Sequence, residues 1–427
     1  MKDKTRKTAF DILCLVEEES AYSSAEILAR ENNDRQSGDF IRKLVYGVLE
    51  RKLYLDYIID KLSAKGIKSV DKKALAILRM GLYQIIYMDS VPDYAAIDSS
   101  VELAREAIKG REGFINAVLR NSLRNGLSLE LPSRDKAFSK YLSVYYSIDE
   151  SIINNWIDAY GEEGCEKIAK GMLEANKLCV RVNLLKTTFD EVKAELENLG
   201  LEIEESRLSN RALIIIDTNG IRITDLEIYQ DGKISIQSEE SIYISDLVSS
   251  ERGDSVLDVC AAPGGKTAAM AECMLNEGSI TSWDIYEHRI NRIKPLMERL
   301  GIDIVKAEVW DGTEEKTDLL ESFDRVLVDA PCSGYGVMGS KPEIRYRKTE
   351  EIKELPSIQS KILEVSSGYT KPGGLMVYST CTINKDENQS IIKSFIDKHK
   401  EYTLIKEEQL TPIDGFKGFY VAVLKKN

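Results

Sequence analysis

Apolar residues at helical spacing dominate the first part of the chain. They recur three and four positions apart, for example in residues 74–80, and this repeat lines one face of a helix. Proline is absent from residues 1–125 except for Pro92. The stretch therefore predicts a compact helix bundle. Residues 134–175 predict further helices after a break at residues 131–133.

A different pattern begins near residue 178. Residues 178–183 alternate between apolar and polar side chains like a strand, and residues 212–216 form a second apolar run. Between them, Thr188 is expected to cap a helix that runs to about Leu199. The order strand, helix, strand favours a small α/β subdomain.

From about residue 235, short apolar runs bounded by turn residues alternate with helical stretches. The runs cover residues 255–259, 279–284, 304–309, 325–329 and 375–379. This alternation predicts a mostly parallel sheet with helices on both faces, an α/β Rossmann-like fold. We therefore expect three domains, at residues 1–130, 131–235 and 236–427.

Composition and charge narrow the function classes. The chain has 427 residues, 43% of them hydrophobic, and a net charge of −13. Residues 1–130 hold 21 Lys and Arg against 20 Asp and Glu, so the acidity belongs to the later part and a local basic face remains possible in the first. No apolar run is long enough to span a bilayer, and no signal peptide is expected.

Cysteine and histidine usage excludes several kinds of site. The seven cysteines are an odd number, are scattered and contain no CxxC pair, and the chain has only two histidines. A disulfide framework, a metal cluster and a Ser-His-Asp triad are therefore not expected. Reduced thiols fit a cytoplasmic protein.

The first chemical signal is a glycine-containing turn at residues 258–267, between a predicted strand and a predicted helix. Paired glycines let the backbone approach a ligand closely. A Walker A loop needs glycine where Cys260 stands, and no dinucleotide GxGxxG is present. An ordinary strand-to-helix turn is the alternative. Asp284 and Asp311 follow later strands; each alone is more often a cap or turn residue, but together they favour a nucleoside-binding crevice.

The second signal is a pair of cysteines after neighbouring strands. Cys332 follows the strand that ends at Asp329, and Cys381 follows the next strand. A lone cysteine is more often a small buried apolar residue. Two at the ligand edge of one sheet suggest a thiolate nucleophile.

Together these motifs resemble the Sun/Fmu-type bacterial small-subunit rRNA cytosine-5 methyltransferases, within the wider group of the nucleolar NOL1/NOP2 proteins. The resemblance rests on residues 258–267, on Asp-Ala-Pro-Cys-Ser-Gly at residues 329–334 and on Ser-Thr-Cys at residues 379–381. The start of the chain resembles the NusB-like RNA-binding domain of this family, through residues 45–49 and 114–120. The resemblance covers nearly the whole chain.

The resemblance implies a cofactor, a reaction and a substrate. The cofactor is S-adenosylmethionine, and the family's binding positions fall on Cys260, Ala261, Ala262, Pro263, Gly264, Gly265, Lys266, Asp284, Asp311 and Asp329. Cys381 is expected to attack C6 of a cytosine in 16S rRNA, Asp329 to face N3 of the base and Cys332 to assist product release. The RNA would have to present the cytosine unstacked.

Several alternatives stay open. Cys332 is the rival nucleophile, because the Pro-Cys cysteine is the nucleophile of DNA cytosine-5 methyltransferases. The same chemistry on tRNA, or a non-catalytic antitermination-like RNA-binding protein, would also fit. A monomer is expected. Arg181, Lys341, Arg345 and Arg347 are candidates for phosphate contacts, with solvated surface charge as the alternative.

Overall fold

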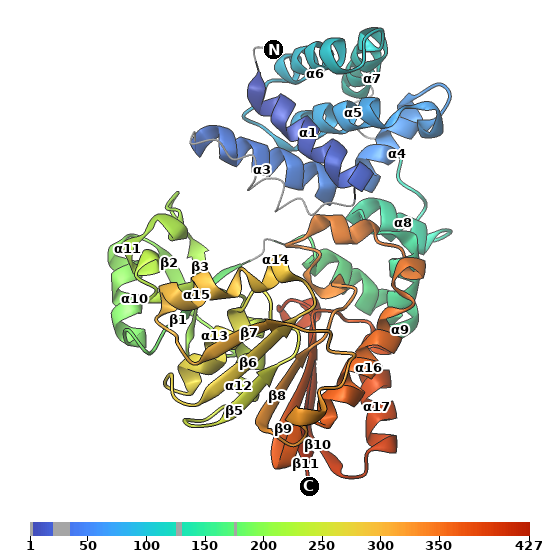
Figure 1. The fold of residues 1–427 in the computed structure, drawn as a ribbon. Helices are drawn as coiled ribbons and strands as arrows, with labels where there is room; N and C mark the ends of the chain where they lie inside the picture. The colour runs from blue at the N-terminus through green and yellow to red at the C-terminus, as the bar shows by residue number, and fades with distance from the viewer. Residues whose placement is uncertain (1–2, 20–34, 125–129, 175–176) are drawn as a thin grey trace. The chain divides into compact units, whose positions relative to one another are not determined.

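The computed structural model describes residues 3–19, 35–124, 130–174 and 177–427 and forms two units (Figure 1). The helical unit consists of Met1–Glu174 together with Met338–Glu351, and the sheet unit consists of Ala175–Val337 together with Ile352–Asn427. Residues 20–34 of the predicted bundle lie outside the described residues. The domain limits expected at residues 130 and 235 stay predictions.

Amphipathic helices build the helical unit, as the apolar spacing predicts. The helices are α1 (Lys4–Glu19), α3 (Arg35–Glu50), α4 (Lys52–Leu62), α5 (Lys72–Tyr87), α6 (Asp93–Ala107), α7 (Glu112–Arg124), α8 (Phe138–Tyr146) and α9 (Glu150–Gly171). Helix α5 begins after Asp71, whose side chain accepts a hydrogen bond of 2.9 Å from Ala74 N, the usual N-cap arrangement. Its Ile77, Leu78 and Leu82 are fully buried in the core of this unit.

A buried ion pair cluster crosses this core. Arg79 is only 6% exposed. Its Nε and Nη2 donate to the two carboxylate oxygens of Asp56 at 2.6 and 2.9 Å, and its Nη1 donates to Glu17. Paired hydrogen bonds of this kind are what allow a guanidinium to lie inside a protein.

The segment Met338–Glu351 packs into the helical unit although it follows strand β8 (Phe323–Asp329) of the other unit. Arg345 is fully buried and donates to the carbonyl oxygens of Tyr146, at 3.1 Å, and of Met172. The neighbouring Tyr346 hydroxyl accepts from Lys52 N at 3.2 Å. The segment is therefore held by buried polar contacts within this unit.

A small antiparallel sheet opens the sheet unit. Its strands are β1 (Leu178–Val182), β2 (Glu202–Glu205), β3 (Ala212–Asp217) and β4 (Ile234–Ile236), in the order β2-β3-β1-β4. Helix α10 (Phe189–Asn198) begins at Thr188 with a complete capping box to Glu191. The predicted α/β subdomain is confirmed, with β2 and β4 as additions.

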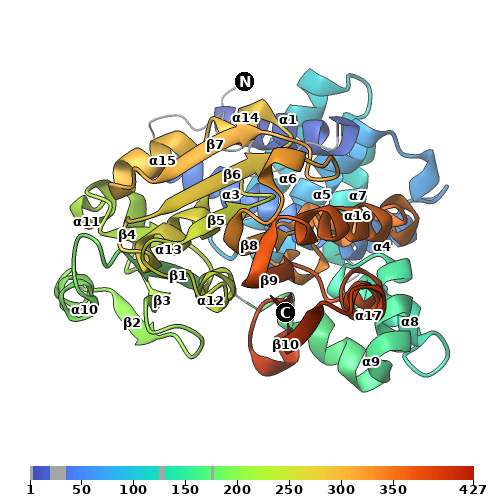
Figure 2. The same ribbon diagram turned by 60° about the horizontal axis from the view of Figure 1, so that its bottom comes forward.

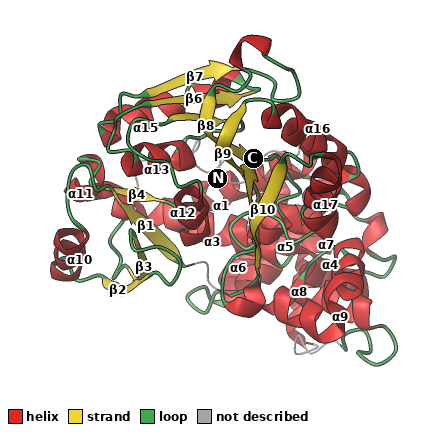
Figure 3. Ribbon diagram, turned by 90° about the horizontal axis from the view of Figure 1, so that it is seen from below, coloured by secondary structure: helices red, strands yellow, loops and turns green. Residues whose placement is uncertain are grey.

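The second sheet has seven strands in the order β10-β11-β9-β8-β5-β6-β7, of which β6 to β9 are labelled in both Figure 2 and Figure 3. They are β5 (Ser255–Asp258), β6 (Ser279–Asp284), β7 (Val305–Val309), β8 (Phe323–Asp329), β9 (Thr370–Thr380), β10 (Tyr402–Leu410) and β11 (Phe419–Lys426). Strands β5 to β9 pair in parallel, whereas β11 pairs antiparallel with β9 and β10. The predicted mostly parallel sheet is confirmed, and the hairpin β10–β11 was not predicted.

Helices cover both faces of this sheet. On one face, α16 (Leu355–Ser367) and α17 (Gln389–Lys398) share a core with Val326 and Val328. On the other, α12 (Glu239–Leu247), α13 (Gly265–Cys273) and α15 (Ile293–Leu300) share a core with Leu327. Successive residues of β8 thus point to opposite cores. In the described ranges, no helix is both long and apolar enough to cross a membrane.

Candidate active site

The strand order brings the predicted site residues to one edge of the large sheet. Strands β9, β8, β5, β6 and β7 are neighbours and run in parallel, so their carboxyl ends share an edge. Along that edge come Cys381 after β9, Asp329 and Cys332 after β8, the turn at residues 259–266 after β5, Asp284 at the end of β6 and Asp311 after β7.

The turn after β5 is shaped by a glycine and a buried carboxyl group. Gly264 has a φ of 101°, a conformation that favours glycine, and helix α13 starts at the next residue. Thr267 Oγ1 donates to Asp258 Oδ2 at 2.7 Å, while Asp258 Oδ1 is buried with no hydrogen-bond partner among the described residues. Burial raises the pKa of Asp258 to about 7.

Arg181 supports the same turn from the small sheet. It is 1% exposed, donates to both carboxylate oxygens of Glu272 at 2.9 and 2.7 Å, and donates to the carbonyl of Gly265 at 2.9 Å. Neither a phosphate contact nor a solvated charge describes this side chain, because it is enclosed and paired. Its position among the buried residues of β1 is the sequence signal that indicates an inward arginine.

Arg345 also departs from the expected phosphate contact. Its side chain is fully buried within the helical unit, with 0% of its surface accessible to solvent. Burial lowers the pKa of its guanidinium. Its two carbonyl partners, Tyr146 and Met172, make it a structural residue.

Asp284 and Asp311 each begin a turn at the sheet edge. Asp284 is 5% exposed and accepts from Tyr286 N at 3.1 Å, with Arg289 at 3.8 Å. Asp311 Oδ1 accepts from both the backbone nitrogen and the hydroxyl of Thr313, at 2.9 and 2.7 Å. Both carboxylates are thus fixed in orientation by their own loops.

Lys266, Asp329 and Ser379 form a polar cluster between the turn and the cysteines. Lys266 Nζ lies 2.6 Å from Asp329 Oδ2, and Ser379 Oγ donates to Asp329 Oδ1 at 2.7 Å. Burial acts to lower the pKa of Lys266, but the negative charge and hydrogen bond of Asp329 outweigh it and raise that pKa. Lys266 therefore stays protonated at neutral pH and donates to Asp329.

The two cysteine sulfurs lie next to each other. Cys332 Sγ and Cys381 Sγ are 3.3 Å apart, and both cysteines are half-buried and not joined by a disulfide. The pKa of Cys332 is raised well above its ordinary value, first by its hydrogen bond to Cys381, then by burial, and then by the negative charges of Cys381 and Glu387. Cys332 is therefore held as a thiol beside Cys381.

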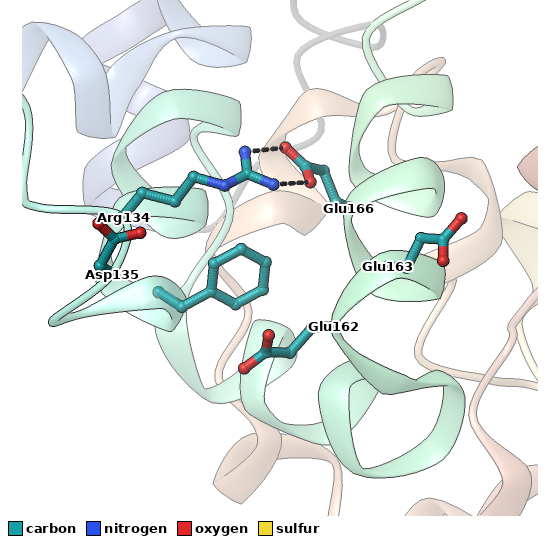
Figure 4. Close-up of a pocket in the computed structure, with 6 residues that line it drawn as sticks. Arg134, Asp135, Glu162, Glu163 and Glu166 are labelled. Carbon is teal, nitrogen blue, oxygen red and sulfur yellow. Dashed lines mark hydrogen bonds and ion pairs between the residues drawn. The ribbon is translucent and has the colours of Figure 1, made fainter.

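A pocket in the helical unit has a different character (Figure 4). Its volume is about 380 Å³, and it is lined by Arg134, Asp135, Phe138, Glu162, Glu163 and Glu166. Both carboxylate oxygens of Glu166 already accept from Arg134, at 2.7 and 2.6 Å. The remaining carboxylates make this pocket repel a phosphate, so it is no candidate for an RNA contact.

Three family models match the chain. A 16S rRNA methyltransferase RsmB/F model matches residues 246–420, a NusB family model matches residues 3–124, and a RsmF/B-like ferredoxin-like domain model matches residues 150–222. The first covers every residue of the sheet edge described above.

Curated relatives are similar along almost their whole length. A Bacillus subtilis (strain 168) protein named "Probable ribosomal RNA small subunit methyltransferase B" is 37% identical over 412 residues, 94% of this chain and 90% of the relative. A Synechocystis relative with the same name is 30% identical, covering 93% of this chain and 90% of its own.

Solved structures share the architecture. The crystal structure of PH0851 is similar over 100% of both chains, with a TM-score of 0.82 and 26% identity. A methyltransferase homologue from Pyrococcus horikoshii matches 67% of this chain and 98% of its own, with a TM-score of 0.61 and 26% identity.

Proposed function

The chain belongs to the ribosomal RNA small subunit methyltransferase B family, and from this premise we propose that it methylates C5 of a cytosine in 16S rRNA through a covalent bond between Cys381 and C6. The family supports the coarser statement, methylation of small-subunit rRNA that depends on S-adenosylmethionine. The observation that carries the finer one is the pair of sulfurs 3.3 Å apart, at the same sheet edge as the ion pair of Lys266 and Asp329.

The residues of the edge fit S-adenosylmethionine. Its sulfonium and ammonium groups are positive, and the edge gathers Asp258, Asp284, Asp311 and Asp329, one of which has a buried oxygen with no partner among the described residues. The turn at residues 260–266 would hold the cofactor against the backbone, with Asp284 toward the ribose and Asp311 toward the adenine. The bound cofactor supplies an electrophilic methyl group.

Cys381 supplies the nucleophile that activates the base. Its thiolate attacks C6, the C5–C6 double bond opens and electron density moves toward N3, which takes up a proton. C5 is then enamine-like and accepts the methyl group. Asp329, held in place by Lys266, accepts a hydrogen bond from the new N3–H. A base then takes the C5 proton, the C6–S bond breaks to release the Cys381 thiolate, and loss of the N3 proton restores the neutral aromatic ring.

Cys332 fits a role in the release step better than in the attack. A thiol with a raised pKa is a poor nucleophile at neutral pH. The same proton, held 3.3 Å from Cys381 Sγ, can donate to the sulfur that leaves C6. The position of Cys332 beside the leaving sulfur fits release, and the choice of Cys381 as the attacking group rests on the family resemblance of the Thr-Cys motif after β9.

The remaining assignments follow from the same proposal. The NusB-like part and the small α/β subdomain are proposed to hold structured RNA, and the protein is proposed to act as a monomer in the cytoplasm. Sedimentation that shows a stable dimer at micromolar concentration would contradict the monomer. Methyl transfer to tRNA in preference to 16S rRNA would replace the substrate but keep the chemistry.

The test compares wild type, Cys381→Ala, Cys332→Ala and the control Cys14→Ala, a half-buried cysteine of the helical unit. Each is incubated with 16S rRNA and methyl-labelled S-adenosylmethionine and run on denaturing gels. We expect no labelled RNA and no adduct with Cys381→Ala, and a trapped protein–RNA adduct with Cys332→Ala. The reverse pattern would make Cys332 the nucleophile.

A wild-type protein that labels no RNA calls for a second measurement. Titration calorimetry with S-adenosylmethionine then separates two cases. Binding without transfer means that the substrate is wrong, whereas no binding favours the non-catalytic RNA-binding protein.

A further inference from the structure

We propose that Glu387, which lies outside both cysteine motifs, is a positioning residue that fixes the two cysteine loops against each other. The proposal rests on the function proposed above for Cys332 and Cys381 and deepens it. Glu387 ends a short 3-10 helix, Lys385–Glu387, that follows β9, and its side chain is fully buried.

The carboxylate of Glu387 reaches the residue that follows each cysteine. Its Oε2 accepts from the backbone nitrogen of Ser333 at 2.8 Å, directly after Cys332. Its Oε1 accepts from the hydroxyl of Thr382 at 3.4 Å, directly after Cys381. One side chain therefore joins two loops that are 49 residues apart in the sequence.

A second contact holds the Cys332 loop from its other side. Gln359 Nε2, on α16, donates to Glu387 Oε2 at 2.9 Å and to the carbonyl of Pro331 at 2.8 Å. Pro331 precedes Cys332 and Ser333 follows it. Glu387 Oε2 holds the backbone nitrogen of Ser333 directly and the carbonyl of Pro331 through Gln359, so it fixes the chain on both sides of the cysteine.

The two loops also contact each other directly, and this hydrogen-bond chain continues to the carboxylate of Glu387. Ser333 Oγ and Thr382 Oγ1 are 2.8 Å apart, and Thr382 Oγ1 donates on to the carboxylate. Asn384 Nδ2 adds a further hydrogen bond to Oε1, at 3.2 Å. The carboxylate is therefore the common acceptor of four neutral donors.

This role requires a carboxylate in particular. Two oxygens serve four donors, and a buried carboxylate keeps its charge only when its hydrogen bonds are made. Glutamine would offer one acceptor and turn its NH₂ group toward a donor, which leaves buried groups unsatisfied. The charge also faces Cys332, whose pKa it helps to raise, so Glu387 influences both the distance between the thiols and which of them keeps the proton.

The experiment uses the full-length protein with Glu387→Gln and Gln359→Met. The first removes the charge and the link, and the second keeps the charge but removes the link to Pro331. Glu240→Gln is the matched control, because Glu240 is equally buried and also accepts from a backbone nitrogen, that of Lys417 at 2.7 Å. Circular dichroism confirms that each variant is folded.

Two readouts need neither RNA nor cofactor. Diamide oxidises two adjacent thiols to a disulfide, and mass spectrometry of unreduced peptides then measures how fast Cys332 and Cys381 join. Alkylation by iodoacetamide across pH measures when Cys332 becomes reactive. We expect slower disulfide formation in both variants, an alkylation midpoint of Cys332 that moves to lower pH in Glu387→Gln alone, and wild-type behaviour in Glu240→Gln.

Methyl transfer is the third readout. For Glu387→Gln we expect kcat to fall on the order of 10–100-fold, as for a misplaced reacting group, with affinity for S-adenosylmethionine unchanged. Wild-type rates of disulfide formation in both variants would overturn the proposal, whatever their activity. If the wild type methylates no RNA but the variants still form the disulfide more slowly, the positioning role of Glu387 is retained and the proposed function is rejected. If Glu387→Gln does not fold, Gln359→Met decides through the disulfide rate.

Discussion

Two buried side chains, Arg79 in the helical unit and Asp258 in the sheet unit, differ in how completely their polar atoms are hydrogen-bonded. In the helical unit, all three guanidinium nitrogens of Arg79 donate to carboxylates of the same unit. In the sheet unit, Asp258 is fully buried, yet one of its oxygens has no partner among the described residues, and its pKa is raised. A charge whose hydrogen bonds are complete stabilises the fold, whereas one with an unused acceptor at the edge of a sheet is suited to a ligand.

The largest expected effect on stability comes from breaking the complete cluster. Arg79→Leu leaves Asp56 without its bidentate partner and Glu17 with Lys52 alone, so we expect the free energy of unfolding to fall by about 3–5 kcal/mol. Urea unfolding followed by circular dichroism measures it. Arg134→Leu, which removes an exposed pair with Glu166, is the control and should change little. Equal losses in both variants would contradict the distinction.

Substitutions at the carboxyl-end edge of the large sheet should change activity rather than stability. Lys266→Met leaves Asp329 without its cation, and we expect kcat to fall by about 10²–10³-fold, as when a preorganised charged donor is lost from an active site. Single-turnover methyl transfer measures the rate, and thermal unfolding should change little. Lys294→Met, on the exposed face of α15, is the matched control. A near-wild-type rate would exclude Lys266 from the reaction.

The smallest expected effect is a change in pH dependence. Burial raises the pKa of Asp258 from 3.8 to about 7, so the folded state favours the protonated form. Its stabilising contribution is complete below the unfolded pKa and is lost as pH rises through about 7. The free energy of unfolding of Asp258→Asn should therefore fall less than that of wild type as pH rises. At alkaline pH we expect the variant to be more stable than wild type by about 1–2 kcal/mol.

Urea unfolding of wild type and Asp258→Asn at both ends of this pH range checks the prediction. If the two proteins lose stability in parallel, the pKa of Asp258 is the same in the folded and unfolded states and the prediction is wrong. Weaker binding of S-adenosylmethionine to Asp258→Asn would sharpen the contrast with Arg79. It would show that the Asp258 carboxyl, which lowers stability at alkaline pH, also contributes to cofactor binding.

The sequence predicts elements well where local pattern decides them. The centres of β5 and β8, residues 256–257 and 326–328, are apolar and buried, and the capping box at Thr188 is a local signal. The hairpin β10–β11 was missed although β11 is a buried apolar run. Its partner β10 gives the weaker signal, because the consecutive polar residues 406–409 interrupt its apolar residues at the border of the sheet. Such a strand gains its stability from pairing, which a local pattern does not show.

The candidate site was predictable in position but not in its supports. Strand ends, a glycine turn and two cysteine motifs place the residues of the edge in advance, although their individual roles stay predictions. Glu387 and Gln359 carry no such motif, and their contacts join segments far apart in the chain. Arg345 looked like a surface cation, because nothing nearby in sequence indicates that Met338–Glu351 packs into the helical unit.

That placement of Met338–Glu351 has a consequence for protein synthesis. A ribosome releases the chain from its N-terminus, so the helical unit lacks a buried part until residue 351 has emerged. By then most of the large sheet's strands have already been made. A gene fragment that stops at residue 174 would therefore encode a helical unit in which Tyr146 and Met172 lack the buried Arg345 that hydrogen-bonds their carbonyl oxygens.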